Sequence, residues 1–145
     1  MFFGTYTPRL DDKARLVLPA KFRDELAEGL VLAKGHEGCL YVWARDVFAR
    51  QAAELARASM SDRSAREYRR ALFGGARDDP ADKQGRLTIP PDLREYAGLD
   101  KDVVAIGAMD HIEIWDAARW AADSPDRDAQ YKNLDAPAYP GTDHS

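Results

Sequence analysis

Residues 11–23 read DDKARLVLPAKFR, and residues 82–94 read DKQGRLTIPPDLR. At an offset of 71 positions the two stretches share five identities, which are Asp11/Asp82, Arg15/Arg86, Leu16/Leu87, Pro19/Pro90 and Arg23/Arg94. After one inserted residue the similarity resumes at an offset of 72, with identities at Val31/Val103, Ala33/Ala105, Gly35/Gly107 and Trp43/Trp115. Chance similarity rarely keeps its register over such a length. The chain therefore contains two copies of one structural unit.

Each copy repeats the same pattern of expected elements. An apolar segment ends at a proline, which cannot donate to a β-ladder, and we expect short strands there at 15–19 and 86–90. Proline is favourable at the start of a helix, so short helices should follow at 19–26 and 90–96. Two further strands with a glycine-containing turn between them complete each copy, at 30–33 and 39–43, and at 103–106 and 111–115.

So few short strands cannot bury enough apolar surface for either copy to be stable alone. We therefore expect the two copies to interleave their hairpins into one β-barrel with a pseudo-twofold axis. The predicted fold class is α+β, mainly β, with short helices flanking the barrel. Such an arrangement would bring residues 11–15 and 82–86 to one face of the molecule.

The repeat divides the chain into four regions. The first copy is expected at 1–50 and the second at 81–123, with a helical connector at 51–80. Helix-forming residues predict one helix over 46–58 and another that starts after Ser61 or Asp62 and runs to Phe73. Asp116 should cap a helix at 117–122, and residues 124–145 are expected to form a disordered acidic tail.

Composition favours a soluble protein of a reducing cytoplasm. Hydrophobic residues make up 45% of the chain and charged residues 32%, and no apolar run is long enough to cross a membrane. The N-terminus has no signal-peptide pattern, and the single cysteine, Cys39, excludes a disulfide within the chain. The net charge is −4, and the acidity lies in residues 81–145. A nucleic-acid interface would therefore require a local cluster of cations.

The two stretches that precede the first strand of each copy are the strongest candidate site. Each contains an aspartate and an arginine four residues apart, Asp11 and Arg15 or Asp82 and Arg86. Arginine is suited to bidentate recognition of phosphate and guanine, and the aspartate would hold the guanidinium in place. We expect a DNA-binding face at Arg15, Arg86, Lys13, Lys83, Asp11, Asp82 and Arg9, which Lys21, Arg23 and Arg94 could widen. The alternative interpretation is structural: the aspartate only orients the arginine or caps a turn.

No other pattern indicates chemistry. His36 and Cys39 have the spacing of a metal-ligand pair, but no companion pair is visible, so no metal or other cofactor is expected. No catalytic constellation or phosphate-binding loop stands out, and the chain is not expected to be an enzyme. The cluster Arg63, Arg66, Arg69 and Arg70 could bind phosphate, although a solvated face or a subunit contact is the favoured interpretation.

The segments MFFG (1–4), LDDKARLVLPAKFR (10–23), DKQGRL (82–87) and IWD (114–116) together resemble the MraZ family of transcriptional regulators. The resemblance covers roughly residues 1–122 and leaves the tail outside. It implies a tandem SpoVT-AbrB-type swapped-hairpin fold that assembles into a ring homo-oligomer such as an octamer. It also implies binding to double-stranded DNA at short tandem repeats of the chain's own promoter, regulation of the bacterial division and cell-wall gene cluster, and association with the nucleoid. The family's DNA contacts centre on the motif found here at Asp11, Lys13 and Arg15 and at Asp82 and Arg86.

The chain departs from the family pattern in both motifs. Ala14 stands where glycine usually precedes the arginine, and Gln84 stands where lysine is usual. If the backbone there requires a positive φ, the first motif is strained or reshaped and Arg15 points differently from Arg86. Two alternative functions remain: an antidote-like protein-interaction module of the same fold, and a purely structural ring.

Overall fold

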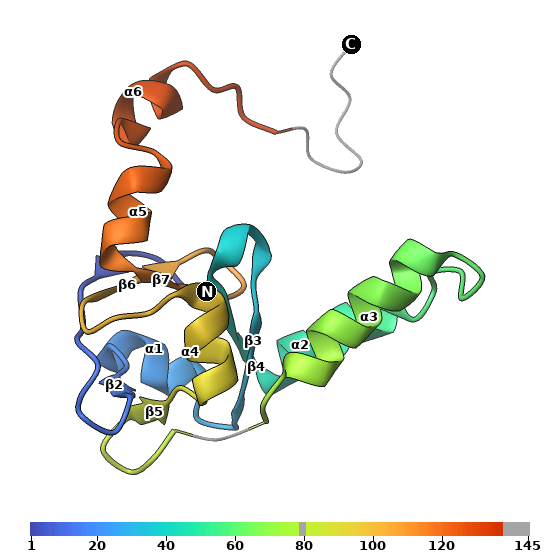
Figure 1. Ribbon diagram of the computed structural model, residues 1–145, viewed down its shortest axis with the longest axis horizontal. Coiled ribbons are helices and arrows are strands. Elements are labelled where there is room, and N and C mark those ends of the chain that lie inside the picture. Colours follow the sequence, from blue (N-terminus) through green and yellow to red (C-terminus); the bar gives the residue numbers. More distant parts are fainter. Residues whose placement is uncertain (79–80, 138–145) are drawn as a thin grey trace.

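The computed structural model describes residues 1–78 and 81–137 (Figure 1). In chain order the elements are β1 (Thr5–Tyr6), β2 (Arg15–Val17), α1 (Ala20–Glu25), β3 (Leu30–Lys34), η1 (His36–Gly38), β4 (Leu40–Ala44), α2 (Arg45–Leu55), α3 (Arg63–Gly75), β5 (Arg86–Thr88), α4 (Pro91–Ala97), β6 (Val103–Gly107), β7 (Ile112–Asp116), α5 (Ala117–Asp123) and α6 (Arg127–Lys132). The predicted α+β class is confirmed, but the described residues hold six helices beside the antiparallel strands, with more residues in helices than in strands, so the fold is not mainly β as expected.

The main sheet contains strands of both copies in the order β1-β6-β7-β4-β3. Each copy supplies an antiparallel hairpin, β3–β4 or β6–β7, and the two hairpins join through β4 and β7, where Leu40 lies opposite Ile114. The expectation that the copies pack together is therefore met within a single sheet.

A second point of contact is the two-stranded ribbon formed by β2 and β5. Leu16 lies opposite Leu87, and the antiparallel register extends by one hydrogen bond at each end. The Leu18 amide donates to the Gly85 carbonyl, and the Ile89 amide donates to the Ala14 carbonyl, both at 2.9 Å. The ribbon thus relates the two copies by reciprocal contacts.

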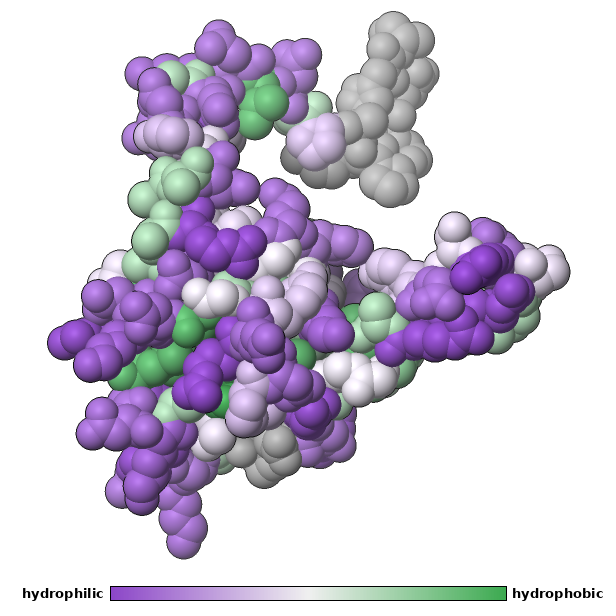
Figure 2. All heavy atoms as spheres, viewed as in Figure 1, coloured by the Kyte–Doolittle hydropathy of each residue, from purple (hydrophilic) through white to green (hydrophobic). Residues whose placement is uncertain are grey.

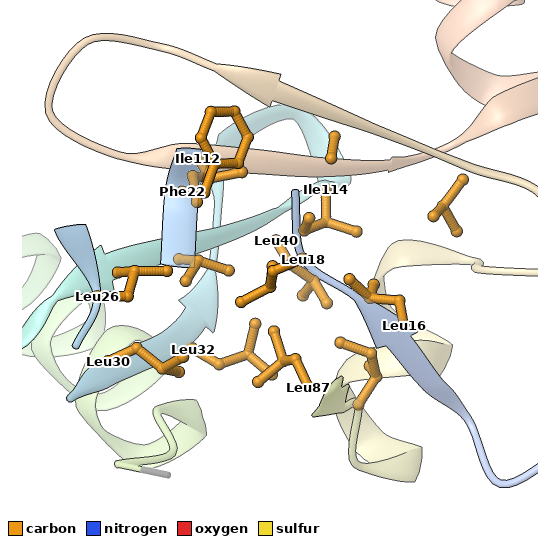
Figure 3. Packing of buried hydrophobic residues seen from close by; sticks show 14 of the residues in the cluster. Leu16, Leu18, Phe22, Leu26, Leu30, Leu32, Leu40, Leu87, Ile112 and Ile114 are labelled. Carbon is orange, nitrogen blue, oxygen red and sulfur yellow. The ribbon is translucent and has the colours of Figure 1, made fainter. Parts of the chain in front are cut away.

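One hydrophobic core lies between the ribbon and the sheet. Figure 3 shows Leu16, Leu18 and Leu87 of the ribbon pointing into the same interior as Leu32 and Ile112 of the sheet. All five side chains are at most 1% exposed. Each such side chain contributes about 1.5–3 kcal/mol through burial. Because the core contains residues of both copies, neither copy holds a complete core without the other.

The strands of the described residues do not close into the barrel that the repeat led us to expect. The five-stranded sheet is open, with β1 and β3 at its edges, and the β2–β5 ribbon is a separate sheet. Proline explains why the ribbon stays short, since Pro19 and Pro90 end the strands soon after they begin and cannot extend a ladder.

The helices follow the expected pattern outside the sheet. Helices α2 and α3 form a hairpin that projects from one side of the body, and α5 and α6 project from another (Figure 1). Asp62 caps α3 by accepting from the Ser64 amide, and Asp116 caps α5 by accepting from the Arg119 amide, as the sequence indicated. No helix among the described residues is both long and apolar enough to cross a membrane.

The segment expected to be a disordered tail, 124–145, is described only to residue 137. Within it lies α6, a helix that the sequence interpretation did not include. Asp126 accepts from the Ala129 amide at the start of α6, and the Arg127 guanidinium lies 3.3 Å from the centre of the Trp120 ring of α5. These contacts tie the start of the segment to α5, whereas residues 138–145 lie outside the described part.

Candidate nucleic-acid interface

Residues 11–15, here called the first loop, form a tight turn around the carboxylate of Asp11. Its Oδ1 accepts from the backbone amides of Lys13 and Arg15, both at 2.9 Å, and its Oδ2 accepts from Arg15 Nε at 2.8 Å. The bond from the Arg15 amide is the main reason that the pKa of Asp11 lies below its usual value of 3.8. The aspartate is therefore charged at neutral pH and fixes both the loop backbone and the arginine.

Residues 82–86, the second loop, repeat this geometry. Asp82 Oδ1 accepts from the amides of Gln84 and Arg86 at 2.9 and 2.8 Å, and Oδ2 accepts from Arg86 Nε at 2.7 Å. The corresponding hydrogen bonds lower the pKa of Asp82, and the bond from the Arg86 amide has the largest effect. The two arginines are thus oriented in the same way.

Both loops place the residue before the arginine in the left-handed region, with φ of 57° at Ala14 and 73° at Gly85. Alanine reaches this region only at an energetic cost, because its Cβ crowds the following carbonyl. The first loop is therefore strained, as the departure from glycine suggested. It is not reshaped, however, since its hydrogen bonds match those of the second loop and Arg15 is held as Arg86 is.

The short antiparallel β2–β5 ribbon carries one loop at each of its ends, with Arg15 opposite Thr88 and Arg86 opposite Val17, and both loops lie at the lower left of Figure 1. Hydrophilic side chains dominate this region in Figure 2. The Arg15 and Arg86 side chains are 25% and 31% exposed. The described residues provide partners only for their Nε groups, so the Nη groups of both arginines can donate to a ligand.

The other expected contacts differ in their surroundings. Lys13 and Lys83 are exposed on the first and second loops, although they do not occupy equivalent positions in the repeat. Arg9 precedes the first loop, and its Nε lies 2.9 Å from the Asp102 carboxylate in an exposed ion pair. Arg9 would have to exchange this partner in order to contact DNA, whereas the lysines would not.

The arginines of α3 serve mainly to close the helical hairpin. Arg69 donates to the Leu55 carbonyl at the end of α2 at 2.9 Å, and Arg66 donates to the Met60 carbonyl at 2.7 Å. Arg70 pairs with Glu67. These contacts favour a structural role over phosphate binding for the cluster.

An apolar groove between the α2–α3 hairpin and β4 was not anticipated. It has a volume of about 690 Å³, and aromatic side chains line much of it, namely Tyr41, Trp43, Phe48, Tyr68 and Tyr96. Its walls come from the first copy, the connector and α4, which lie apart in the sequence. No local sequence pattern predicted that these residues would lie together.

His36 and Cys39 do not form a metal-binding pair. The buried Cys39 thiol donates to the His36 carbonyl at 3.2 Å, while the His36 ring stacks on Tyr68. Burial raises the pKa of Cys39 to about 12, which keeps it a thiol.

Comparison with known proteins adds a second line of evidence. A family model described as "MraZ protein, putative antitoxin-like" matches the chain twice, over residues 1–71 and 72–134, once for each copy. The transcriptional regulator MraZ of Kocuria rhizophila is 52% identical over 141 residues, which cover 97% of this chain and 99% of that protein. The proteins of the same name from Micrococcus luteus and a Nocardioides species are 51% and 55% identical, covering 97% and 92% of this chain and 99% and 93% of their own.

Proposed function

The chain belongs to the MraZ family, and we propose that it is a transcriptional regulator that binds double-stranded DNA through its first and second loops. Membership of a family of regulators confirms the expectation that the chain is not an enzyme. The finer parts of the proposal are binding to short tandem repeats in its own promoter, regulation of the division and cell-wall gene cluster, a ring homo-oligomer such as an octamer, and a nucleoid-associated place in the cytoplasm.

The observation that carries the proposal is the matched pair of oriented arginines. Arg15 and Arg86 are each held through Nε by an aspartate, and each keeps its Nη groups for a ligand. A planar guanidinium with a fixed orientation can donate two parallel hydrogen bonds to a phosphate or to guanine O6 and N7. The two loops lie at the ends of one short ribbon, so a single duplex can contact both.

Ring assembly would reconcile DNA binding with the net charge of −4. Each subunit offers only a few cations, and these give weak binding alone. Several subunits that face successive repeats multiply the effect, because later contacts form at a high effective concentration. The reciprocal β2–β5 pairing agrees with the swapped-hairpin relationship that the resemblance implies.

The proposal is tested by fluorescence anisotropy with a duplex from upstream of the chain's own gene and a scrambled duplex of equal length. The wild type should prefer the native duplex, and the double variant Arg15→Ala, Arg86→Ala should lose that preference while keeping the wild-type circular dichroism spectrum. Equal binding to both duplexes, or binding that the double substitution leaves unchanged, would contradict the proposal.

The second candidate function is an antidote-like protein-interaction module. The aromatic groove and the antitoxin-like description of the family model favour it. A folded wild-type chain that shows no preference for the native duplex would make this candidate the stronger one.

A further inference from the structure

Arg23 packs directly on the second loop. A Cβ added at Gly85 would lie 2.6 Å from Arg23 Nη1 and would also overlap its Cδ, so the arginine occupies the space that the missing side chain leaves. Arg23 Nη1 also approaches the Gln84 carbonyl at 3.5 Å. The guanidinium therefore rests against the loop backbone, and glycine makes this approach possible.

Arg94 is the counterpart of Arg23 in the second copy and stands in the same relation to the first loop. Helix α1 begins two residues after Leu18, which binds Gly85, and α4 begins two residues after Ile89, which binds Ala14. Arg94 is nevertheless exposed, and the described part of the chain offers its side chain no hydrogen bond or ion pair. The nearby Asp92 is occupied by Arg77, whose Nη2 lies 2.8 Å from its carboxylate.

The methyl group of Ala14 accounts for this difference. Ala14 shares the left-handed conformation of Gly85, so its Cβ projects into the space that corresponds to the one filled by Arg23. An Arg94 side chain placed on the first loop as Arg23 is placed on the second would overlap this methyl group, and Arg94 is exposed.

We propose that Arg94 contacts a DNA phosphate beside the first loop, that Arg23 instead positions the second loop, and that the residue at position 14 or 85 decides between these roles. The inference rests on the proposed DNA-binding function. Arg94 then adds a cation beside the first loop. Its charge offsets the carboxylate of Asp12, which stands where the second loop has Lys83. The two copies thus bind the duplex with comparable charge from different residues.

The test compares the salt dependence of DNA affinity for full-length wild type, Arg94→Ala, Arg94→Lys and Arg23→Ala, with a duplex from upstream of the chain's own gene. Each phosphate contact contributes about 0.9 to the slope of log affinity against log salt concentration. Arg94→Ala should lower the slope by about 0.9 for each bound subunit, and Arg94→Lys should retain it. Arg23→Ala should weaken binding without changing the slope, because Arg23 supports the loop and touches no phosphate.

The variant Ala14→Gly sharpens the test. It should let Arg94 fold onto the first loop and lower the slope as Arg94→Ala does, and adding Arg94→Ala to it should then change the slope no further. An unchanged slope in Arg94→Ala, or equal losses in Arg94→Ala and Arg23→Ala, would overturn the inference while leaving the proposed function intact. A wild type without a preference for the native duplex would overturn both.

Discussion

The first and second loops reach one hydrogen-bond geometry with different residues at the left-handed position, Ala14 in one and Gly85 in the other. In both, three bonds to an aspartate define the turn and the direction of the arginine. The comparison teaches that the aspartate determines the loop shape strongly enough to hold an alanine at positive φ. Glycine is needed in the second loop for a further reason, since it admits Arg23 against the backbone.

The largest expected effect tests whether the two copies are one folding unit. Leu16→Ala and Leu87→Ala each remove a buried side chain from the shared core and should each lower the free energy of unfolding by about 2–5 kcal/mol. Urea unfolding followed by circular dichroism should show one transition in both variants. Val17→Ala, at a 53% exposed site on the same ribbon, is the matched control and should change stability by about 0.5 kcal/mol or less. A two-step curve, with one copy unaffected, would show that the copies fold separately.

The next effect concerns the aspartates. Asp11→Ala and Asp82→Ala remove the acceptor that orients the arginine and should each weaken DNA binding about tenfold. The DNA affinities of Asp11→Asn and Asp82→Asn should lie between those of the alanine variants and that of the wild type. An amide oxygen still accepts from the loop amides but offers no charge to the arginine. Anisotropy titrations at one salt concentration give the DNA affinity of each variant. If only the variants of one loop lose affinity, the two copies are not equivalent.

A smaller effect separates the two left-handed residues. Ala14→Gly should raise the free energy of unfolding by about 1 kcal/mol, because glycine adopts positive φ without steric cost. Gly85→Ala should lower it, since the new methyl group is both strained and in the place of Arg23. Thermal unfolding of the two variants gives opposite shifts in Tm on this account, and a lower Tm for Ala14→Gly would contradict it.

The smallest effect concerns a position where the copies differ in their response to pH. Cys39 and His111 are counterparts in the repeat, and the pKa of Cys39 is too high for it to ionise near neutrality. Burial lowers the pKa of His111, but the carboxylates of Glu113 and Asp110 outweigh it and raise the pKa above 6.5. The stabilisation that protonated His111 provides is fully present below its pKa in the unfolded chain. It is lost as the pH rises through the higher pKa that His111 has in the folded chain.

We therefore expect the free energy of unfolding to fall as the pH rises above about 6.5. His111→Gln should flatten this decline, whereas Cys39→Ala should leave its slope unchanged. Urea unfolding at a series of pH values measures both variants. A decline that persists in His111→Gln would assign the effect to another group.

Much of the architecture could be predicted because the chain contains two copies of the same sequence pattern. The repeat, the strands ended by Pro19 and Pro90, and the paired aspartate and arginine of each loop follow from local patterns. The joining of β4 to β7 and the open sheet could not be predicted, because strand pairing depends on packing between residues far apart in the sequence. The pairing of Arg9 with Asp102 and the walls of the aromatic groove escaped prediction for the same reason.

The central claim is that Arg15 and Arg86 make equivalent contacts with DNA. The most direct test is the salt dependence of binding to the native duplex, from about 50 to about 200 mM salt, for the wild type and for Arg15→Ala and Arg86→Ala measured separately. Each single variant should weaken binding to the native duplex by the same factor. A lost phosphate contact should also lower the slope of log affinity against log salt by about 0.9 for each bound subunit, whereas a lost contact to guanine should leave the slope unchanged. An affinity that neither substitution changes, or that only one of them lowers, would contradict the claim.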